Sequence, residues 1–266
     1  MGTFATVRKN LLLCWLLLFV AFLYMPILSI TYTSFNEDVV WPFPPSFSWD
    51  AYLDLIEARA YQEALWNSIV VGLGSAVMAT AFALPAAMAV LRYPTRLRAV
   101  AVILFVSPLF VAELLVGIST LVFNKQILGL SGSIWGAMFG NAVHCFAFAF
   151  LILVAQLLRH NWAMEEAAKV FGATPARAFF EVTLPTIWPA ILGAFLTSFL
   201  LAFNNLDISF YNLGAIPVLP TLSWGSLRYG LKPELFSLST LVNGFILLCF
   251  MVMIAVILLR GRRAAA

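Results

Sequence analysis

The stretch LLLCWLLLFVAFLYMPILSI, from Leu11 to Ile30, decides the fold class. It contains no charged side chain and has the length of about 20 residues that a helix needs to cross a membrane. No small-x-small cleavage site closes the run, and the apolar part of a secretory signal peptide is only about 7–15 residues long. We therefore expect an uncleaved first membrane helix at about residues 11–31.

The composition of the whole chain points to the same class. Of the 266 residues, 63% are hydrophobic and 10% are charged, whereas a soluble domain has about 45–50% apolar and about 25% charged residues. The composition predicts an all-α integral membrane protein and excludes a disordered chain, a disulfide-rich secreted scaffold and a nucleic-acid-binding domain. Cys14, Cys145 and Cys249 lie singly in apolar runs, so we interpret them as small buried hydrophobic residues.

Six apolar segments have the length of a membrane span. Their runs are too long and too uniformly apolar for the alternating strands of a membrane barrel. Pro26, Pro85 and Pro108 fall within spans and predict kinks. The chain is expected to be a single transmembrane domain, 1–266, with spans at about residues 11–31, 65–91, 100–123, 134–158, 189–208 and 238–259.

Basic residues are distributed unevenly around these spans. Eleven of the fifteen Lys and Arg residues lie on the side that holds both termini, and the positive-inside rule places that side in the cytoplasm. Six of the twelve acids lie in the first outside loop, residues 32–64. In that loop Trp49, Tyr52, Leu53 and Ile56 recur at helical spacing and predict a short amphipathic helix, which either rests at the membrane interface or receives an external partner.

The cytoplasmic loop at residues 159–188 predicts two short helices that cross at a glycine. Glu166, Ala167 and Ala168 open the first helix, and Gly172 is expected to end it in a left-handed conformation. Thr174 is expected to cap the second helix, with Pro175 at its first position. Such a loop is suited to insertion into a groove on another protein. Its expected apolar anchors are Phe171 and Phe179.

The same loop resembles the EAA loop of the inner-membrane permeases of ABC importers. In that motif Glu-Ala-Ala is followed at fixed spacing by a glycine and by Leu-Pro, here Gly172 and Leu184-Pro185, with Val182 where Ile is commoner. The resemblance implies the type I permease fold of ABC importers and a coupling helix docked on a cytoplasmic ATPase. The implied coupling residues are Glu166, Ala167, Ala168, Phe171, Gly172, Ala173, Phe179, Leu184 and Pro185.

Other parts of the chain resemble the spermidine/putrescine permeases of this family. Leu219-Pro220, Trp224 and Pro233-Glu234 resemble their last outside loop. Those permeases usually carry two adjacent acids after a phenylalanine in span five, where this chain has Phe203-Asn204-Asn205-Leu206-Asp207. The resemblance implies a polyamine or a related small organic cation as substrate. The departure in span five leaves another small solute open, such as an opine, a phosphonate or an amino-acid derivative.

Two acids, Glu113 and Asp207, are expected at membrane depth, where ionised side chains are rare and usually functional. Each predicts either a lining group of the translocation path or a hydrogen bond between helices. Phe195, Phe199 and Phe203 are four residues apart and are expected to form a face leading to Asp207, suited to an organic cation through cation–π contact; packing is the alternative. The candidate path residues are Asp207, Asn204, Asn205, Phe203, Phe199, Glu113 and Trp224.

The sequence contains no GxxxxGK[ST] loop to hold the phosphates of ATP. We therefore expect no catalytic residue, metal site or cofactor in this chain. The resemblance implies a bacterial cytoplasmic (inner) membrane, an ATPase dimer that binds ATP and Mg, a second and different permease subunit, and a periplasmic or extracellular substrate-binding protein. The alternative of another class is a self-sufficient secondary transporter, with Glu113, His144 and Asp207 as its relay groups. An intramembrane enzyme would need a nucleophile–base or metal constellation, which we do not find.

Overall fold

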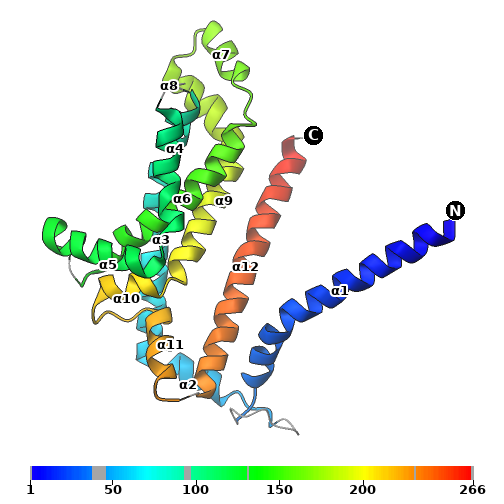
Figure 1. The fold of residues 1–266 in the computed structure, drawn as a ribbon, viewed down its shortest axis with the longest axis vertical. Coiled ribbons are helices and arrows are strands. Elements are labelled where there is room, and N and C mark those ends of the chain that lie inside the picture. The colour runs from blue at the N-terminus through cyan, green and yellow to red at the C-terminus, as the bar shows by residue number, and fades with distance from the viewer. Residues whose placement is uncertain (1, 38–45, 93–96, 131, 231, 265–266) are drawn as a thin grey trace. The chain divides into compact units, whose positions relative to one another are not determined.

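The computed structural model describes residues 2–37, 46–92, 97–130, 132–230 and 232–264. These residues form mainly helices (Figure 1). One isolated antiparallel bridge links Asn36 and Phe47. They fall into two compact units. Unit 1 comprises Met1–Arg59 and Ser223–Leu248, and unit 2 comprises Ala60–Leu222 and Cys249–Ala266.

Unit 1 is held together where its three helices meet. The Ser34 hydroxyl lies 2.7 Å from the Tyr52 hydroxyl, and the Ser237 hydroxyl donates to the Ser34 carbonyl at 3.2 Å. These bonds join the end of the first helix to the short helix and to the start of the last one. The helices are α1 (Gly2–Thr33), α2 (Asp50–Glu57) and α12 (Pro233–Ala264).

The amphipathic helix predicted in the first outside loop is α2. Tyr52 and Leu55 are buried, whereas Trp49, Leu53 and Ile56 are exposed. The exposed side chains lie on one apolar face, as a helix resting at a membrane interface requires. The predicted loop 32–64 is shorter than expected, because α3 already begins at Arg59.

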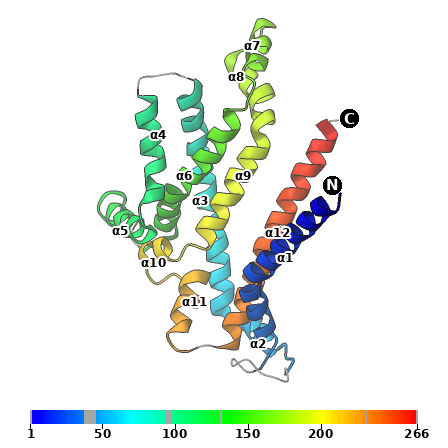
Figure 2. The same ribbon diagram turned by 45° about the vertical axis from the view of Figure 1, so that its right-hand side comes forward.

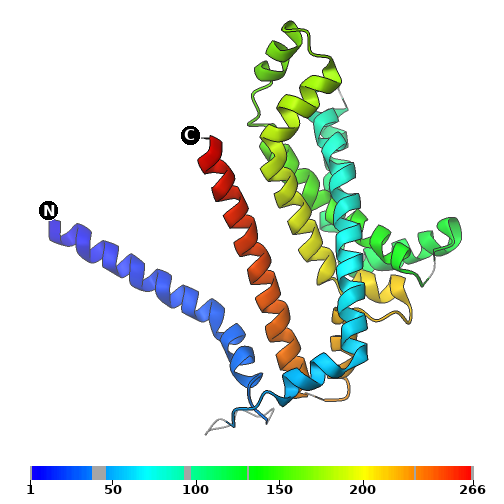
Figure 3. The same cartoon turned by 180° about the vertical axis from the view of Figure 1, so that it is seen from behind.

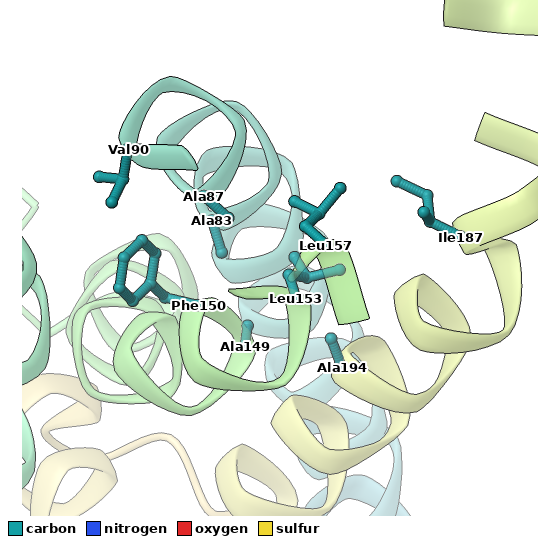
Figure 4. Close-up of a cluster of buried hydrophobic side chains, with 9 residues drawn as sticks. All are labelled: Ala83, Ala87, Val90, Ala149, Phe150, Leu153, Leu157, Ile187 and Ala194. Carbon is teal, nitrogen blue, oxygen red and sulfur yellow. The ribbon is translucent and has the colours of Figure 1, made fainter. Parts of the chain in front are cut away.

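Three long helices form the centre of unit 2 around an apolar cluster (Figure 4). Ala83 and Ala87 of α3 let the backbone of α6 approach, so that Phe150 and Leu153 fill the space between them. Nearer the start of α3, a Cβ on Gly72 would lie 3.0 Å from the Phe199 ring of α9. The small residues Gly72, Ala83 and Ala87 therefore lie on the packing face of α3. Figure 3 shows α3 beside α9 along unit 2. The three helices are α3 (Arg59–Arg92), α6 (Ile134–Leu157) and α9 (Leu184–Phe203).

The span expected at about 100–123 is bent much more sharply than a proline kink. The helical pieces Arg98–Phe110 and Glu113–Leu128 meet at an angle of 106° (Figure 2). Pro108 lacks a backbone donor, and Val111 is extended, with ψ of 131°. A kink was expected at Pro108, but the helix breaks outright. The pieces are α4 (Arg98–Val106), the 3-10 turn η1 (Ser107–Phe110), α5 (Glu113–Phe123) and the π-helical η2 (Asn124–Leu128).

The prediction of one helix over 189–208 is wrong at both ends. The helix α9 begins earlier, at Leu184, and ends at Phe203. The Asn205 side-chain oxygen accepts a hydrogen bond from the Ile208 amide at 2.8 Å and so starts a new helix. Asp207 therefore lies on a different helix from Phe199 and Phe203. The following helices are α10 (Asp207–Leu213) and α11 (Leu219–Leu227).

Three of the remaining spans are longer than predicted, and α6 matches the expected range 134–158 to within one residue. The expected ranges 11–31, 65–91 and 238–259 lie within α1, α3 and α12, and Pro26 and Pro85 lie inside continuous helices. Among the described residues, five helices are long and apolar enough to cross a membrane, or six if the bent pair is one span. Cys145 is buried as expected, but Cys14 is exposed, because the neighbouring side chains of α1 are exposed too.

Candidate functional site

The loop that resembles the EAA motif folds as its local sequence predicts. The helix α7 (Ala163–Val170) is followed by Phe171 and then by Gly172, whose φ is +89°. The Gly172 amide donates to the Lys169 carbonyl at 2.9 Å, and the Ala173 amide donates to the Ala168 carbonyl at 3.0 Å. These two bonds form a Schellman motif. The left-handed glycine expected from the sequence is confirmed.

The second helix of the loop is not a separate element. The Thr174 hydroxyl accepts from the Arg177 amide at 3.3 Å and caps α8 (Pro175–Ala178) as predicted. The π-helical segment η3 (Phe179–Thr183) then continues α8 into α9. Leu184 and Pro185 therefore lie inside a continuous helical run, Pro175–Phe203.

The loop exposes apolar side chains at its tip. Phe171 is 91% exposed and Val170 is 85% exposed. Phe180, which the sequence reading did not choose as an anchor, is exposed, whereas Phe179 is half-buried. Figure 1 shows α7 and α8 projecting beyond the ends of α6 and α9. Large apolar side chains that project beyond the apolar spans are typical of a protein-binding surface.

The base of the loop is organised by Glu165, a residue that sequence reasoning missed. Its side chain is 1% exposed. The Arg92 guanidinium at the end of α3 donates to this carboxylate, the Thr183 hydroxyl donates to it at 3.0 Å, and the Lys169 ammonium lies 3.3 Å away. We call these four residues the Glu165 clamp. The clamp joins α3, α7 and η3.

The clamp favours the ionised carboxylate. Burial alone would raise the pKa of the Glu165 carboxyl, but hydrogen bonds from Thr183, Lys169 and Arg92 outweigh burial and hold this pKa below its usual range. Lys169 also bonds to the exposed Glu166 carboxylate at 2.9 Å. That bond is the largest cause of the raised pKa of the Lys169 ammonium. Exposed pairs such as Lys169–Glu166 contribute little to stability.

A second set of polar groups lies in unit 2, among residues that the sequence assigns to membrane spans. The Asn205 amide donates to the Glu113 carboxylate at 2.8 Å, and the His144 Nε2 atom lies 3.5 Å from the same carboxylate. Asn205 and His144 are buried. The sequence singled out these three residues separately, and the structure brings them together from α5, α6 and the start of α10.

A buried network continues from this group, and the sequence reading missed it. The Asn124 amide donates to the Asn212 side-chain oxygen at 2.7 Å, and the Asn212 amide donates to the Thr120 hydroxyl at 3.0 Å. Gly140 passes so close that a Cβ there would lie 2.9 Å from the Thr120 oxygen. The signal in the sequence is the set of asparagines within apolar runs, each of which needs partners in a membrane.

The other candidate path residues are more dispersed. Phe199 and Phe203 are buried, and both lie against Gly72 of α3. Asn204 is exposed and bonds back to the Leu200 carbonyl at 3.1 Å. Asp207 is half-buried at the first position of α10, and Trp224 is exposed on α11. The expected aromatic face leading to Asp207 along one helix is therefore not formed.

Comparison with known proteins identifies relatives along almost the whole chain. The putrescine transport system permease protein PotI of Escherichia coli K12 is 30% identical over 255 residues, which are 92% of this chain and 89% of PotI. The spermidine/putrescine permease PotC of Haemophilus influenzae is 26% identical, covering 84% of this chain and 86% of PotC. The putative 2-aminoethylphosphonate permease PhnV of Salmonella typhimurium is 25% identical, covering 79% of this chain and 77% of PhnV.

Solved structures agree on the fold. A bacterial ABC transporter that imports the acidic polysaccharide alginate contains a chain with a TM-score of 0.73 at 19% identity, and the match covers 96% of this chain and 97% of that one. The methionine transporter MetNI contains a chain with a TM-score of 0.60 at 17% identity, and the match covers 79% of this chain and 97% of that one. No family model matches the chain. The predicted permease fold is confirmed.

Proposed function

This chain belongs to the family of ABC-importer permease subunits, and on that premise we propose that it forms half of the membrane path for a polyamine or a related small organic cation. The observation that carries the substrate class is the similarity to PotI over 92% of the chain. The carboxylate of Glu113, which the sequence assigns to a membrane span and Asn205 holds, supports it. An ionised carboxylate attracts an organic ammonium by its charge.

The energy comes from a partner in this proposal. Two ATPase subunits dock on the α7–α8 loop of this chain and on its counterpart in a second permease subunit. The exposed Phe171 and Val170 supply the apolar contact. ATP binding closes the ATPase pair and moves the loops, and a binding protein delivers substrate from outside the cytoplasmic membrane. The coupling set from Glu166 to Pro185 acts in this step.

The Glu165 clamp gives the coupling loop its connection to the spans. Arg92 ends α3, and Thr183 lies in the segment that continues into α9. A displacement of α7 therefore reaches two membrane helices directly. The termini lie in the cytoplasm in this arrangement, which agrees with the excess of basic residues on their side.

The substrate path involves two different kinds of residue in this proposal. Glu113, Asn205 and Asp207 supply polar contacts near the start of α10. Phe199 and Phe203 lie against α3 and set the helix packing around the path. Asn204 and Trp224 are exposed in the isolated chain and are available to the second permease or to substrate.

The test is ATP hydrolysis by the assembled complex in lipid nanodiscs with its binding protein. Putrescine, spermidine, 2-aminoethylphosphonate and neutral solutes are compared. Stimulation by the polyamines alone is the expected result. Stimulation by a solute without an ammonium group would disprove the cation assignment and leave the importer assignment intact.

A second candidate substrate is 2-aminoethylphosphonate. The similarity to PhnV over 79% of the chain favours it. The amides of Asn204 and Asn205, which replace the adjacent acids of the polyamine permeases, also fit a substrate that carries an anionic group. Selective stimulation by 2-aminoethylphosphonate in the same assay would establish it.

A further inference from the structure

Unit 1 contains a polar cavity of about 150 Å³. It lies where the segment after α1 meets α2 and the start of α12, on the side of the membrane that is expected to be external. Four carboxylates line it, and none of the described lining residues is basic. The lining residues are Asn36, Glu37, Ser48, Asp50, Ala51, Asp54, Pro233 and Glu234.

Two oxygen atoms at this cavity lack a donor. Asn36 is 3% exposed, and its amide nitrogen donates to the Tyr32 carbonyl at 2.8 Å. Its side-chain oxygen receives no hydrogen bond from any described residue, and neither does the buried Oε2 atom of Glu234. A buried acceptor without a donor is unfavourable, because it has lost its hydrogen bonds to water. Both atoms are therefore free of any donor among the described residues and can accept a hydrogen bond from a ligand.

The described side-chain donors of the lining are largely engaged. The Asn36 nitrogen donates to the Tyr32 carbonyl, and the Ser48 hydroxyl donates to the Asp50 carboxylate at 2.8 Å. The side chains of the cavity therefore present mainly acceptors and negative charge. This chemistry selects a cation that carries hydrogen-bond donors.

The spacing of the acids distinguishes an organic cation from a metal ion. Among the described residues, no three His, Cys, Asp or Glu groups lie close enough to hold one metal ion. A primary ammonium group has three N–H donors and no acceptor. It can bond to the Asn36 oxygen and to one carboxylate while the more distant acids supply electrostatic attraction.

The cavity is formed by connected elements. The Ser34–Tyr52 and Ser237–Ser34 bonds fix the end of α1 against α2 and α12, and Asn36 itself forms an antiparallel bridge with Phe47. Aromatic contacts of Phe35 with Trp49 and Tyr52 support the same corner. The acceptors are therefore held in place before a ligand arrives, which reduces the entropic cost of binding.

We propose that this cavity is an outer binding site for the primary ammonium group of a small alkyl amine. The ligand meets the site before it enters the membrane path. The role in transport rests on the proposed function, whereas the binding itself rests only on the cavity. The two are therefore tested separately.

The experiment is isothermal titration of putrescine onto the complete ATPase–permease complex, without binding protein, in nanodiscs of neutral phosphatidylcholine. Glu234→Gln and Asp54→Asn each remove one charge with little change of shape. Glu57→Gln is the matched control, because Glu57 is an exposed acid on α2 that does not line the cavity. We expect saturable binding that weakens at least tenfold in the first two variants and stays within twofold in the control. The neutral isostere 1,4-butanediol should not compete.

Three results would overturn the site. These are no saturable binding to the parent complex, equal binding in all three variants, and displacement of putrescine by equimolar Ca²⁺ or Mg²⁺. Uptake of putrescine with the binding protein present is measured in parallel. Binding that follows the variants without any uptake would leave the site standing and remove the proposed substrate. Uptake of putrescine together with equal binding in all variants would remove the site and leave the proposed substrate standing.

Discussion

The carboxylate of Glu165 is bonded to the guanidinium of Arg92, 73 positions earlier in the chain. One residue opens the coupling loop, and the other is the last residue of α3. The contact makes the loop part of the helix packing, so its position depends on the state of the spans. Four predictions follow from this and from the other contacts.

Glu165→Gln should uncouple the loop. The variant keeps the shape but removes the charge that Arg92 and Lys169 face, which should cost about 1–3 kcal/mol of local stability. We expect faster hydrogen exchange across residues 163–183 and at least a fivefold loss of substrate-stimulated ATP hydrolysis. Glu181→Gln is the control, because Glu181 makes only an exposed pair with Arg177 at 2.8 Å. Equal behaviour of the two variants would contradict the clamp.

The clamp should also depend on pH. The pKa of Glu165 is lowered in the folded protein, so its contribution to stability is complete above the unfolded value of about 4.3. The contribution is lost as the pH falls from there through the folded pKa. Loop protection should therefore be level from pH 6 to 8 and should decline below about pH 4. Hydrogen exchange measures this, and Glu165→Gln should lack the acid-dependent part of the loss.

Gly172→Ala should weaken the loop through backbone conformation alone. The φ of +89° is unfavourable for a residue with a Cβ, although the added atom would meet nothing within 4 Å. The left-handed conformation costs such a residue about 1–2 kcal/mol. Gly193→Ala is the control, since its Cβ also meets nothing and the site lies within α9. We expect weaker coupling and faster loop exchange in the first variant only.

Asn205→Leu should disturb the group formed by Glu113, His144 and Asn205. It removes the donor to Glu113 and the cap of the Ile208 amide, which should cost about 1–3 kcal/mol. Asn204→Leu is the matched control, because it makes the same change of side chain and removes only a hydrogen bond to the Leu200 carbonyl. The midpoint temperature of thermal unfolding in nanodiscs and the rate of substrate uptake should both fall in the first variant, whereas the midpoint temperature should change little in the second. A larger effect at Asn204 would place the functional amide there.

The sequence predicted features governed by local rules. Apolar length located the spans, and the demand for a left-handed residue located the turn at Gly172. Thr174 followed from capping chemistry in the same way. Each of these depends on residues within a few positions of one another.

Features set by distant partners were missed. The burial of Glu165 depends on Arg92, and the pairing of Glu113 with Asn205 joins residues 92 positions apart. The break before Glu113 was missed for another reason. A proline within a membrane span often only kinks it when neighbours satisfy the freed carbonyls, so Pro108 alone does not predict a turn of 106°.

The continuity of the helical run from Pro175 to Phe203 has a mechanical consequence. Its 29 residues correspond to about 43 Å at a rise of about 1.5 Å per residue. A tilt of about 10° about the Pro175 end would carry the Phe203 end through about 7 Å on that length. A rigid run would therefore convert a small tilt at Pro175 into a larger displacement at Phe203. Bending at its π-helical segment, Phe179–Thr183, would reduce that displacement.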